Sequence, residues 1–586
     1  YASDMYFISG QNLGPEYFAE EKSDGSYVPI PYQGDYGTDG FHLDFSDPDD
    51  LGKDVSGTGN NLAYEQNQGT HFTVSDSPTN NYCTLNPLST PYNAWTLSEG
   101  NLKGFSAGSN YGQSTFVLQS GKWYFEIDCT DVDGKEGLLI SLNETTATWS
   151  EGQGWDVSIV YAGDVGLYGI SIDLDMGSWS TTLNGSALSS GSFSMHPDGC
   201  KISVANGNGQ NSCTISANFG QRSWSFNPPA GYESICTNNL PDISVNPKEH
   251  FSTTTWTGND SSSRAITTGV DADFVWYKDR TGTESNSLYD SVRGAQMRIM
   301  SNSTDYERDR TTGLLSFDST GFTVGADTEC NGSGKNYVGW NWKAGGTAVA
   351  NNDGSIPTMV SVNKDMGFSI TGYTGTGNSG ATIGHGLGAI PSLVIIKKIK
   401  SNGTDGDRGW PVWSSELSSV RSFLYLNRST PESADDYFKD TWPTSSLITL
   451  RGELDASYQE VNFAGDDYIM YCFTNTDMLK VGWYAGNGDD NGPFVSLPFK
   501  PAVLICKSIT TDYGWSMLDS ERSPSNAVKN VLYPNENNAE VDSYSIVDLL
   551  SNGFKWRIGG SNGNSLGAKY LYLAIAEEYQ KYSRGR

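Results

Sequence analysis

Short stretches in which apolar and polar side chains alternate recur along the whole chain. Clear examples are Gly121–Ile127 (GKWYFEI) and Tyr468–Phe473 (YIMYCF), and clusters of Gly, Asn, Asp and Ser separate such stretches. Side chains two residues apart on a strand share a face of the sheet, so this period predicts half-buried β-strands joined by tight turns. The pattern therefore predicts an all-β, multi-domain protein.

Three stretches in the C-terminal part repeat the same order of patterns. Each opens with an aromatic residue and a glycine two residues later, continues with an apolar strand that ends in lysine, and closes with a glycine before an aromatic strand. The openings are Trp256–Gly258, Tyr373–Gly375 and Tyr484–Gly486; the lysine strands are Phe274–Lys278, Leu393–Lys397 and Val503–Lys507; the closing segments are Gly334–Trp342, Gly465–Phe473 and Gly567–Ile575. A period of about 110 residues suits a small β domain.

We therefore expect three β repeats at residues 248–365, 366–477 and 478–586, in which Tyr337, Tyr468 and Tyr570 are equivalent. The first and third repeats also share a second pattern, Asp290–Arg293 (DSVR) and Asp519–Arg522 (DSER). Triplication of a β module extends a protein's surface and does not by itself create one active site.

The N-terminal part divides into three sections. Residues 1–85 form an N-terminal segment with expected strands at Met5–Ile8 and Phe41–Phe45, and residues 236–247 form a Pro- and Asn-rich linker. Between them, residues 86–235 form the first complete β module. Its alternation predicts half-buried strands with Trp123 and Phe125 buried on one face, and the resemblance given below implies that about residues 90–232 form a two-sheet antiparallel sandwich.

Charge and composition narrow the classes of function. The chain has 586 residues and a net charge of −31, with 18% charged and 12% aromatic residues. Phosphate binding requires a basic face, so we expect no nucleic-acid partner; the acidity favours solubility. No apolar segment is long enough to span a bilayer, so we expect no membrane insertion. The chain begins at Tyr1 without a leader sequence, which indicates a truncated or processed start.

Cysteines and acidic clusters give little sign of a cofactor. The eight cysteines show no CxxC spacing, so we expect free, buried thiols and no zinc site, although Cys83 and Cys236 bracket one module and could approach each other. Asp47, Asp49 and Asp50 could offer oxygen ligands to calcium, but their spacing matches no calcium loop. We therefore expect no cofactor and leave calcium open at these three residues.

The sequence does not predict a catalytic residue. The five histidines have no metal-ligand spacing, and there is no GxSxG motif. Glu126 and Asp128 lie on one face of a strand and could form a carboxylate pair for sugar cleavage. Because the chain has 68 acidic residues, such pairs arise by chance, and we expect that the protein is not an enzyme.

Five tryptophans near turns or strand ends are candidates for ligand binding: Trp410, Trp413, Trp442, Trp483 and Trp515. An exposed indole can stack on a sugar ring while Asn, Asp and Ser side chains bond the hydroxyls. The alternative for each tryptophan is a place in the core of a sheet.

The module at residues 86–235 resembles the SPRY family. The resemblance rests on the GKWYFEI strand, on Gly163–Asp175 (GDVGLYGISIDLD) and on Asn218–Gly220 (NFG); Met176–Gly185 departs from the regular strand and turn of that family. It implies a concanavalin-like β-sandwich that binds proteins or other ligands through its loops, and it names no ligand.

The wider layout resembles structural proteins of tailed marine bacteriophages, described as tail-fibre or appendage proteins. The motifs are Met5–Phe18 (MYFISGQNLGPEYF), Tyr36–Asp47 (YGTDGFHLDFSD), Ser77–Pro87 (SPTNNYCTLNP), Asn218–Trp224 (NFGQRSW), Cys236–Pro241 (CTNNLP), Leu288–Gly294 (LYDSVRG) and Asn336–Gly346 (NYVGWNWKAGG). In that family a laminin-G-like sandwich often comes first, so Tyr1–Gln11 resemble its final strand.

This resemblance implies a virion location, other virion proteins as partners, contact with a host-surface glycan or envelope component, and a homo-oligomer, most commonly a trimer. Two alternatives stay open. One is a purely architectural component of the virion, in a tail or capsid fibre. The other is a secreted bacterial adhesin or polysaccharide-degrading enzyme.

Overall fold

We analysed a computed structural model of the chain. It describes all residues except 1–3, 22–26, 48, 64–73, 78–79, 90–94, 108–110, 133–137, 145–155, 197–198, 207–211, 243–244, 404–407, 453–458 and 582–586. The chain forms two compact units, one of residues Tyr1–Asp242 with Gln580–Arg586 and one of Ile243–Tyr579.

Nearly all regular structure in the described residues is β, which confirms the all-β, multi-domain prediction. The helices found there are short: η1 (Pro15–Tyr17), η2 (Pro247–Glu249), α1 (Gln459–Asn462) and α2 (Ser561–Asn564). Among these described segments, no helix has the length and apolar character needed to cross a bilayer.

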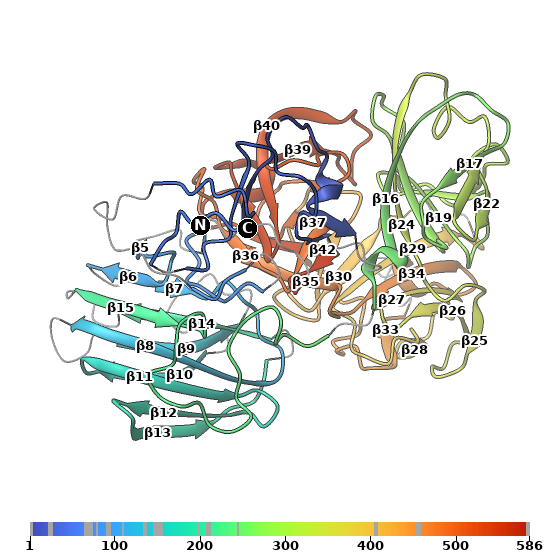
Figure 1. Ribbon diagram of the computed structural model, residues 1–586. Helices are drawn as coiled ribbons and strands as arrows, with labels where there is room; N and C mark the ends of the chain where they lie inside the picture. The colour runs from blue at the N-terminus through green and yellow to red at the C-terminus, as the bar shows by residue number, and fades with distance from the viewer. Residues whose placement is uncertain are drawn as a thin grey trace. The chain divides into compact units, whose positions relative to one another are not determined.

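The first unit contains a two-sheet antiparallel sandwich (Figure 1). One sheet has the order β13-β12-β11-β8-β15-β6-β5 and the other β10-β9-β14-β7. The strands are β5 (Thr96–Ser98), β6 (Lys103–Ser106), β7 (Tyr111–Gln113), β8 (Lys122–Val132), β9 (Leu138–Glu144), β10 (Asp156–Gly163), β11 (Gly166–Asp173), β12 (Ser178–Leu183), β13 (Ser186–Ser192), β14 (Cys200–Asn206) and β15 (Cys213–Asn218).

Strand β8 shows why the alternating pattern becomes a sandwich strand. Trp123 and Phe125 are 2% and 0% exposed, as predicted, and both belong to the core between the sheets. Cys83 and Ile235 belong to the same core, and Tyr82 forms a β-bridge with Cys236. The module therefore starts before residue 86 and ends after residue 235. All eight cysteines are free and buried, as expected.

The N-terminal segment adds two short ribbons. Strand β1 (Met5–Phe7) pairs with β4 (Phe41–Leu43), which confirms both expected strands, and β2 (Ala19–Glu21) pairs with β3 (Tyr27–Pro29). Stacked rings of Tyr6 and His42, with centroids 4.1 Å apart, hold the first ribbon together on one side.

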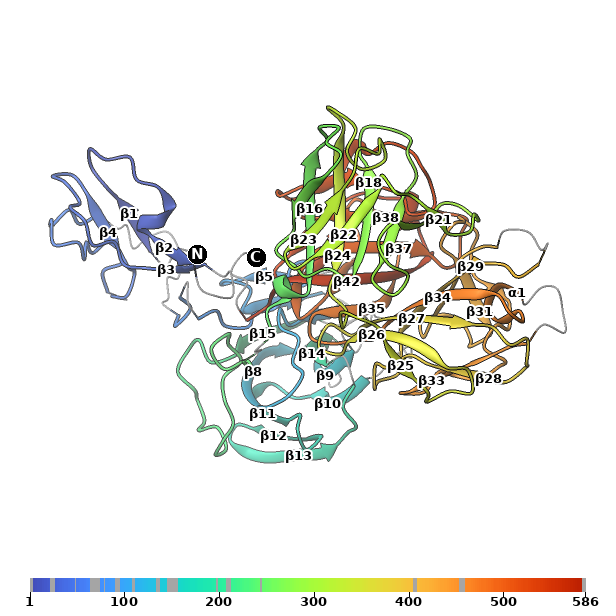
Figure 2. The same cartoon turned by 90° about the vertical axis from the view of Figure 1, so that its right-hand side faces the viewer.

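The second unit contains the three repeats (Figure 2). The first has sheets β16-β24-β18-β19-β20-β21 and β17-β23-β22, the second β25-β26-β27-β34-β29-β30-β31-β32 and β28-β33, and the third β35-β42-β37-β38 and β36-β41-β40-β39.

The bounds of these strands are as follows. In the first repeat they are β16 (Phe251–Thr257), β17 (Arg264–Thr267), β18 (Phe274–Asp279), β19 (Ser287–Asp290), β20 (Met297–Met300), β21 (Arg308–Asp309), β22 (Leu314–Asp318), β23 (Gly321–Val324) and β24 (Asn336–Trp342). In the second they are β25 (Val349–Asn351), β26 (Thr358–Asn363), β27 (Phe368–Thr374), β28 (Ala381–Gly384), β29 (Leu393–Lys400), β30 (Pro411–Ser414), β31 (Ser422–Tyr425), β32 (Ser433–Ala434), β33 (Leu447–Leu450) and β34 (Asp467–Phe473). In the third they are β35 (Leu479–Ala485), β36 (Phe494–Ser496), β37 (Phe499–Ser508), β38 (Trp515–Asp519), β39 (Val528–Val531), β40 (Val541–Leu550), β41 (Gly553–Trp556) and β42 (Lys569–Tyr579).

One boundary differs from the prediction. Strands β25 and β26 had been placed in the first repeat, but β26 pairs with β27 and extends the sheet of the second repeat. The first repeat therefore ends soon after β24. The sequence alone does not show which neighbouring sheet a connecting hairpin joins.

The three repeats share a central trio of antiparallel strands, in which the closing strand lies between the opening strand and the lysine strand. The registers match: Trp256 pairs with Tyr337, Tyr373 with Tyr468, and Tyr484 with Tyr570. In each pair the rings stack, with centroids 5.1 to 5.5 Å apart. Tyr337, Tyr468 and Tyr570 thus occupy equivalent positions.

The opening glycines permit a close backbone approach. A Cβ atom added to Gly258, Gly375 or Gly486 would lie 2.0 to 2.3 Å from a carbonyl oxygen of the loop before the closing strand. The same loop turns at Gly334, Gly465 and Gly567, whose φ angles of +72 to +79° lie in the left-handed region that favours glycine. Sterics therefore explain why the repeated pattern has glycine at both positions.

A buried asparagine joins these two segments in every repeat. Asn331, Asn462 and Asn564 lie six residues before the stacked tyrosines, and each is 0% exposed. Their side-chain oxygens accept the backbone N–H of the residue just after the opening glycine, at 2.8 to 3.1 Å. Their amide groups donate to further loop carbonyls.

Replacement of this asparagine tests how much its side-chain hydrogen bonds stabilise the repeat. Asn462→Leu has similar volume but leaves the N–H of Thr376 and the carbonyl of Asn378 without their partner, so we expect the free energy of unfolding to fall by about 2–5 kcal/mol in urea titrations. The control, Asn378→Leu, changes an exposed side chain and should stay within about 0.5 kcal/mol of the wild type. Equal stability of the two variants would contradict the assignment.

Candidate functional site

The three repeats form a closed ring, because each one donates the same backbone hydrogen bond to the next. The N–H of Glu307 donates to the carbonyl of Ile399 at 3.0 Å, and the N–H of Glu432 to that of Ile509 at 2.9 Å. The N–H of Glu540 returns to the carbonyl of Arg280 in the first repeat at 2.9 Å. We call these junctions the 1–2, 2–3 and 3–1 contacts.

Each contact has a second hydrogen bond in the opposite direction. Its donor is a side chain at the start of β19, β30 or β38, or one residue before it. Trp410 donates its indole N–H to the carbonyl of Ser303 at 3.0 Å, and Trp515 donates to that of Tyr425 at 2.9 Å. At the 3–1 contact Asn286 takes this role and donates to the carbonyl of Glu536 at 2.8 Å. Two of the five candidate tryptophans therefore hold the ring together.

The lysines that end the apolar strands are buried at the same contacts. The ammonium groups of Lys397 and Lys507 donate to the carbonyls of Thr304 and Ser429 in the preceding repeat, at 2.7 and 2.9 Å. Lys278 instead donates to the carbonyl of Gly282 in its own repeat. Burial lowers the pKa of Lys507 to about 7 and that of Lys278 to about 8.

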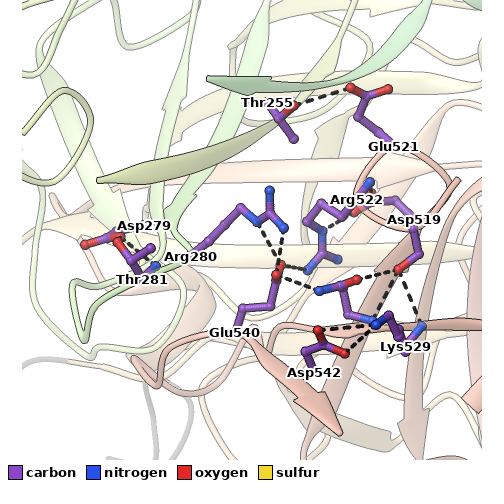
Figure 3. Close-up of polar contacts among 12 residues, drawn as sticks. Thr255, Asp279, Arg280, Thr281, Asp519, Glu521, Arg522, Lys529, Glu540 and Asp542 are labelled. Atoms are coloured by element: carbon purple, nitrogen blue, oxygen red, sulfur yellow. Dashed lines mark hydrogen bonds and ion pairs between the residues drawn. The ribbon is translucent and has the colours of Figure 1, made fainter. Parts of the chain in front are cut away.

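The 3–1 contact contains a buried cluster of charges (Figure 3). The guanidinium of Arg280 donates twice to Glu540, at 2.7 and 2.9 Å, and Arg522 donates to Glu540 at 2.9 Å and to Asp519 at 2.6 Å. Trp340 of the first repeat completes it with an N–H bond to Asp519 at 3.1 Å. Burial alone would raise the pKa of Glu540, but the two arginines outweigh it and hold that pKa below its usual value.

The 1–2 contact has the equivalent cluster with one arginine fewer. Arg293 donates to Asp290 at 2.6 Å and to Glu307 at 3.1 Å, and Tyr471 donates its hydroxyl to Asp290 at 2.7 Å. Burial raises the pKa of Glu307 above its usual value, because Arg293 alone offsets it only in part.

The 2–3 contact keeps Glu432 at the position of Glu307 and Glu540 but lacks the other members of the cluster. Strand register places Ser414 where the other repeats have Asp290 and Asp519, and Leu417 lies where they have Arg293 and Arg522. The aromatic donor is absent too, because Leu573 takes the place of Trp340 and Tyr471. An unpaired charge in such a contact would be costly, so the aspartate and the arginine are replaced together. Glu432 accepts hydrogen bonds from the N–H and the hydroxyl of Ser418 instead.

This coupling can be measured at the 3–1 contact. Asp519→Ser alone leaves the buried Arg522 without its closest carboxylate, so we expect a loss of about 3–5 kcal/mol in the free energy of unfolding. The triple variant Asp519→Ser, Arg522→Leu and Trp340→Leu places the residue types of Ser414, Leu417 and Leu573 at the equivalent positions of the 3–1 contact. It should lose about 1–3 kcal/mol less than the sum of the three single losses. Strict additivity would show that the cluster is not one unit.

Lys507 makes stability depend on pH. Its pKa is about 7 in the folded chain and near the ordinary 10.5 after unfolding, so between these values the unfolded chain binds more protons at this group. Stability therefore rises with pH in that window, by at most about 1.4 kcal/mol per pH unit from this group. Lys507→Met should flatten the rise between pH 7 and 9 in urea titrations, whereas the exposed Lys529→Met should not. An unchanged slope in Lys507→Met would refute the assignment.

Of the five candidate tryptophans, Trp442 is the one with an open face. Trp410, Trp413 and Trp515 are 0%, 1% and 3% exposed, so no ligand can stack on them in this structure. Trp483 is half-buried, and the ammonium of Lys569 lies 4.5 Å above its ring. Trp442 is 53% exposed and rests against Trp413 edge to face, with centroids 5.8 Å apart.

Buried side chains anchor the loop that carries Trp442. Asp436, 3% exposed, accepts the N–H of Asp440 at 2.5 Å and forms an ion pair with Arg451. The hydroxyl of Tyr437 donates to Glu460 at 2.5 Å. Lys439 and Asp440 have φ angles of +51 and +52°, a conformation that costs energy in residues other than glycine. Side chains 439–442 are all exposed, so the anchored loop presents a fixed polar and aromatic tip.

The acidic candidates near residue 50 lie on one turn, and one of them is paired with a lysine. Asp47 pairs with Lys53 at 3.0 Å, while Asp49 and Asp50 lie on the same turn. Within the described ranges, no group of three or more His, Cys, Asp or Glu side chains is placed to hold a metal ion. Glu126 is buried and accepts the N–H groups of Ser225 and Phe226, both at 3.0 Å, so it fixes a loop of the sandwich.

The sequence interpretation missed the ring and its residues. The signals were present: an asparagine precedes each stacked tyrosine by six residues, and Glu307, Glu432 and Glu540 each follow the second strand after the lysine strand. None of them is recognisable as a contact residue until the three repeats are placed around one axis.

Comparison with protein families assigns the C-terminal part of the chain to a family. Residues 246–579, more than half of the chain, match a family described as a domain of unknown function (DUF7483), and the chain belongs to this family. The matched range nearly coincides with the second compact unit, Ile243–Tyr579. No curated protein is similar enough in sequence to count as a relative.

Solved structures similar to part of the chain include two with SPRY-type names or folds. A stonustoxin structure shares 16% identity over 23% of this chain, with a TM-score of 0.19, and this chain spans 27% of its length. The TRIM65 PSpry domain shares 15% identity over 23% of this chain and 92% of its own, with a TM-score of 0.18. The sandwich itself is defined by the strand order given above.

Proposed function

We propose that this chain is a structural protein of a bacteriophage virion, placed in a tail fibre or another surface appendage, and that it binds a host-surface glycan. The observation that carries the binding part is Trp442, an indole with an open face on an anchored loop. The virion part rests on the resemblance of motifs such as Met5–Phe18 and Asn336–Gly346 to phage appendage proteins.

The chemistry of the Trp442 loop suits a carbohydrate. The flat face of an indole packs against the apolar face of a pyranose ring, and neighbouring polar groups bond its hydroxyls. Lys439, Asp440 and Thr441 precede Trp442 in the chain, are exposed like it, and offer a cation, a carboxylate and a hydroxyl. The anchored loop loses little conformational freedom on binding, which favours affinity.

A purely architectural role is the second candidate, and the ring favours it. Hydrogen bonds across all three contacts, with the Arg280–Glu540 ion pair at the 3–1 contact, make a stiff body that suits a spacer in an appendage. In that case the partners would be other virion proteins. The proposal also includes a homotrimer. Its contacts between chains would lie outside the contacts that close the ring within one chain.

Binding can be tested with an immobilised panel of bacterial capsular polysaccharides and lipopolysaccharides and the full chain in solution. We expect at least one polysaccharide to bind, and Trp442→Ala to weaken that binding at least tenfold, since loss of the indole removes the stacking surface. Trp483→Ala is the matched control and should leave binding unchanged, because Lys569 already covers its ring.

Circular dichroism of both variants would show that the fold is intact. Absence of binding to every polysaccharide, or equal binding by Trp442→Ala and the wild type, would overturn the glycan proposal and favour the architectural role.

A further inference from the structure

A cavity of about 30 Å³ lies among the three repeats of the ring. The lysine strands of all three repeats line it through the equivalent residues Trp276, Ile395 and Ile505. Tyr471 and Leu573 of two closing strands and Trp515 from the 2–3 contact also face it. A molecule in this cavity would therefore contact all three repeats at once.

The lining is apolar in character, although it includes aromatic residues with polar atoms. The indole N–H of Trp276 donates to Asn286 at 3.2 Å, that of Trp515 to the carbonyl of Tyr425 at 2.9 Å, and the hydroxyl of Tyr471 to Asp290 at 2.7 Å. Trp342 also lines the cavity. Of the indole N–H groups in this lining, that of Trp342 is the one without a hydrogen-bond partner among the described residues. A buried water needs two to four polar partners, so these walls favour an apolar occupant.

The 2–3 contact explains why space is left at this point. Trp340 and Tyr471 are large because each donates a hydrogen bond to an aspartate of the neighbouring repeat. At the 2–3 contact that aspartate is replaced by Ser414, and the smaller Leu573 stands in the aromatic position. The residue types that leave the 2–3 contact without these charges thus also place a smaller side chain at this side of the cavity.

The size of the cavity limits the occupant. A cavity needs roughly 10–15 Å³ to hold one water molecule, so this one is about two to three times that minimum. It suits a compact apolar molecule of a few heavy atoms.

We propose that the axis of the ring carries a binding site for a small apolar molecule, such as a dissolved light hydrocarbon or halocarbon. This site is independent of the glycan surface at Trp442. Because the occupant contacts all three repeats, it stabilises the closed ring over any state in which a contact opens.

Xenon is a suitable probe, because it is apolar, compact and visible by nuclear magnetic resonance. With the full chain, we expect a saturable shift of the 129Xe signal with protein concentration. We also expect the midpoint of thermal unfolding to rise as the xenon pressure is raised. Leu573→Phe fills the cavity and should remove both effects, and Ile505→Phe is a second filling variant in case the first does not fold.

The matched control is Leu566→Phe, the same change at a side chain of the third repeat that is 74% exposed. It should keep the xenon response of the wild type. Absence of a saturable shift in the wild-type chain would overturn the proposal. So would a full response in a folded Leu573→Phe or Ile505→Phe variant, because the xenon would then bind elsewhere.

Discussion

The backbone bonds from Glu307, Glu432 and Glu540 to the following repeat are the constraint on which the C-terminal unit depends. They occur at the same position in each repeat and lead from the third back to the first, so the chain forms a ring from one repeated unit. Each bond brings the end of a lysine strand, two residues after the lysine, against the neighbouring repeat. The buried lysines, indoles and carboxylates can be satisfied only after this approach.

Differences between the repeats also occur in pairs, because positions that contact each other change together. At one such pair the first repeat has Asp279 with Lys335 and the second has Lys398 with Asp466, with the charges exchanged between the strands. The third repeat has the neutral Ser508 and Ala568 at the same two positions. A buried charge is costly without its partner, so a change at one position is tolerated mainly with a matching change at the other. The loss of the cluster at the 2–3 contact follows the same rule.

This organisation separates the positions that hold the ring from those free to bind. Trp410 and Trp515 bridge repeats, and Trp413 supports the loop above it, so their indoles serve the interior. Trp442 lies one layer further out on an exposed loop, where its identity is not fixed by the ring. Surface loops on a stiff scaffold are common places for binding residues.

The sequence by itself determined the strands, the repeat and the equivalence of Tyr337, Tyr468 and Tyr570, because alternation and glycine position are local signals. It also determined the burial of Trp123 and Phe125, since a strand with one apolar face must cover it. Only the tertiary structure decided which tryptophans are exposed, which sheet β25 and β26 join, and that the repeats close into a ring. These features depend on contacts between segments far apart in the chain, and strand periodicity shows which side of a strand is buried but not what covers it.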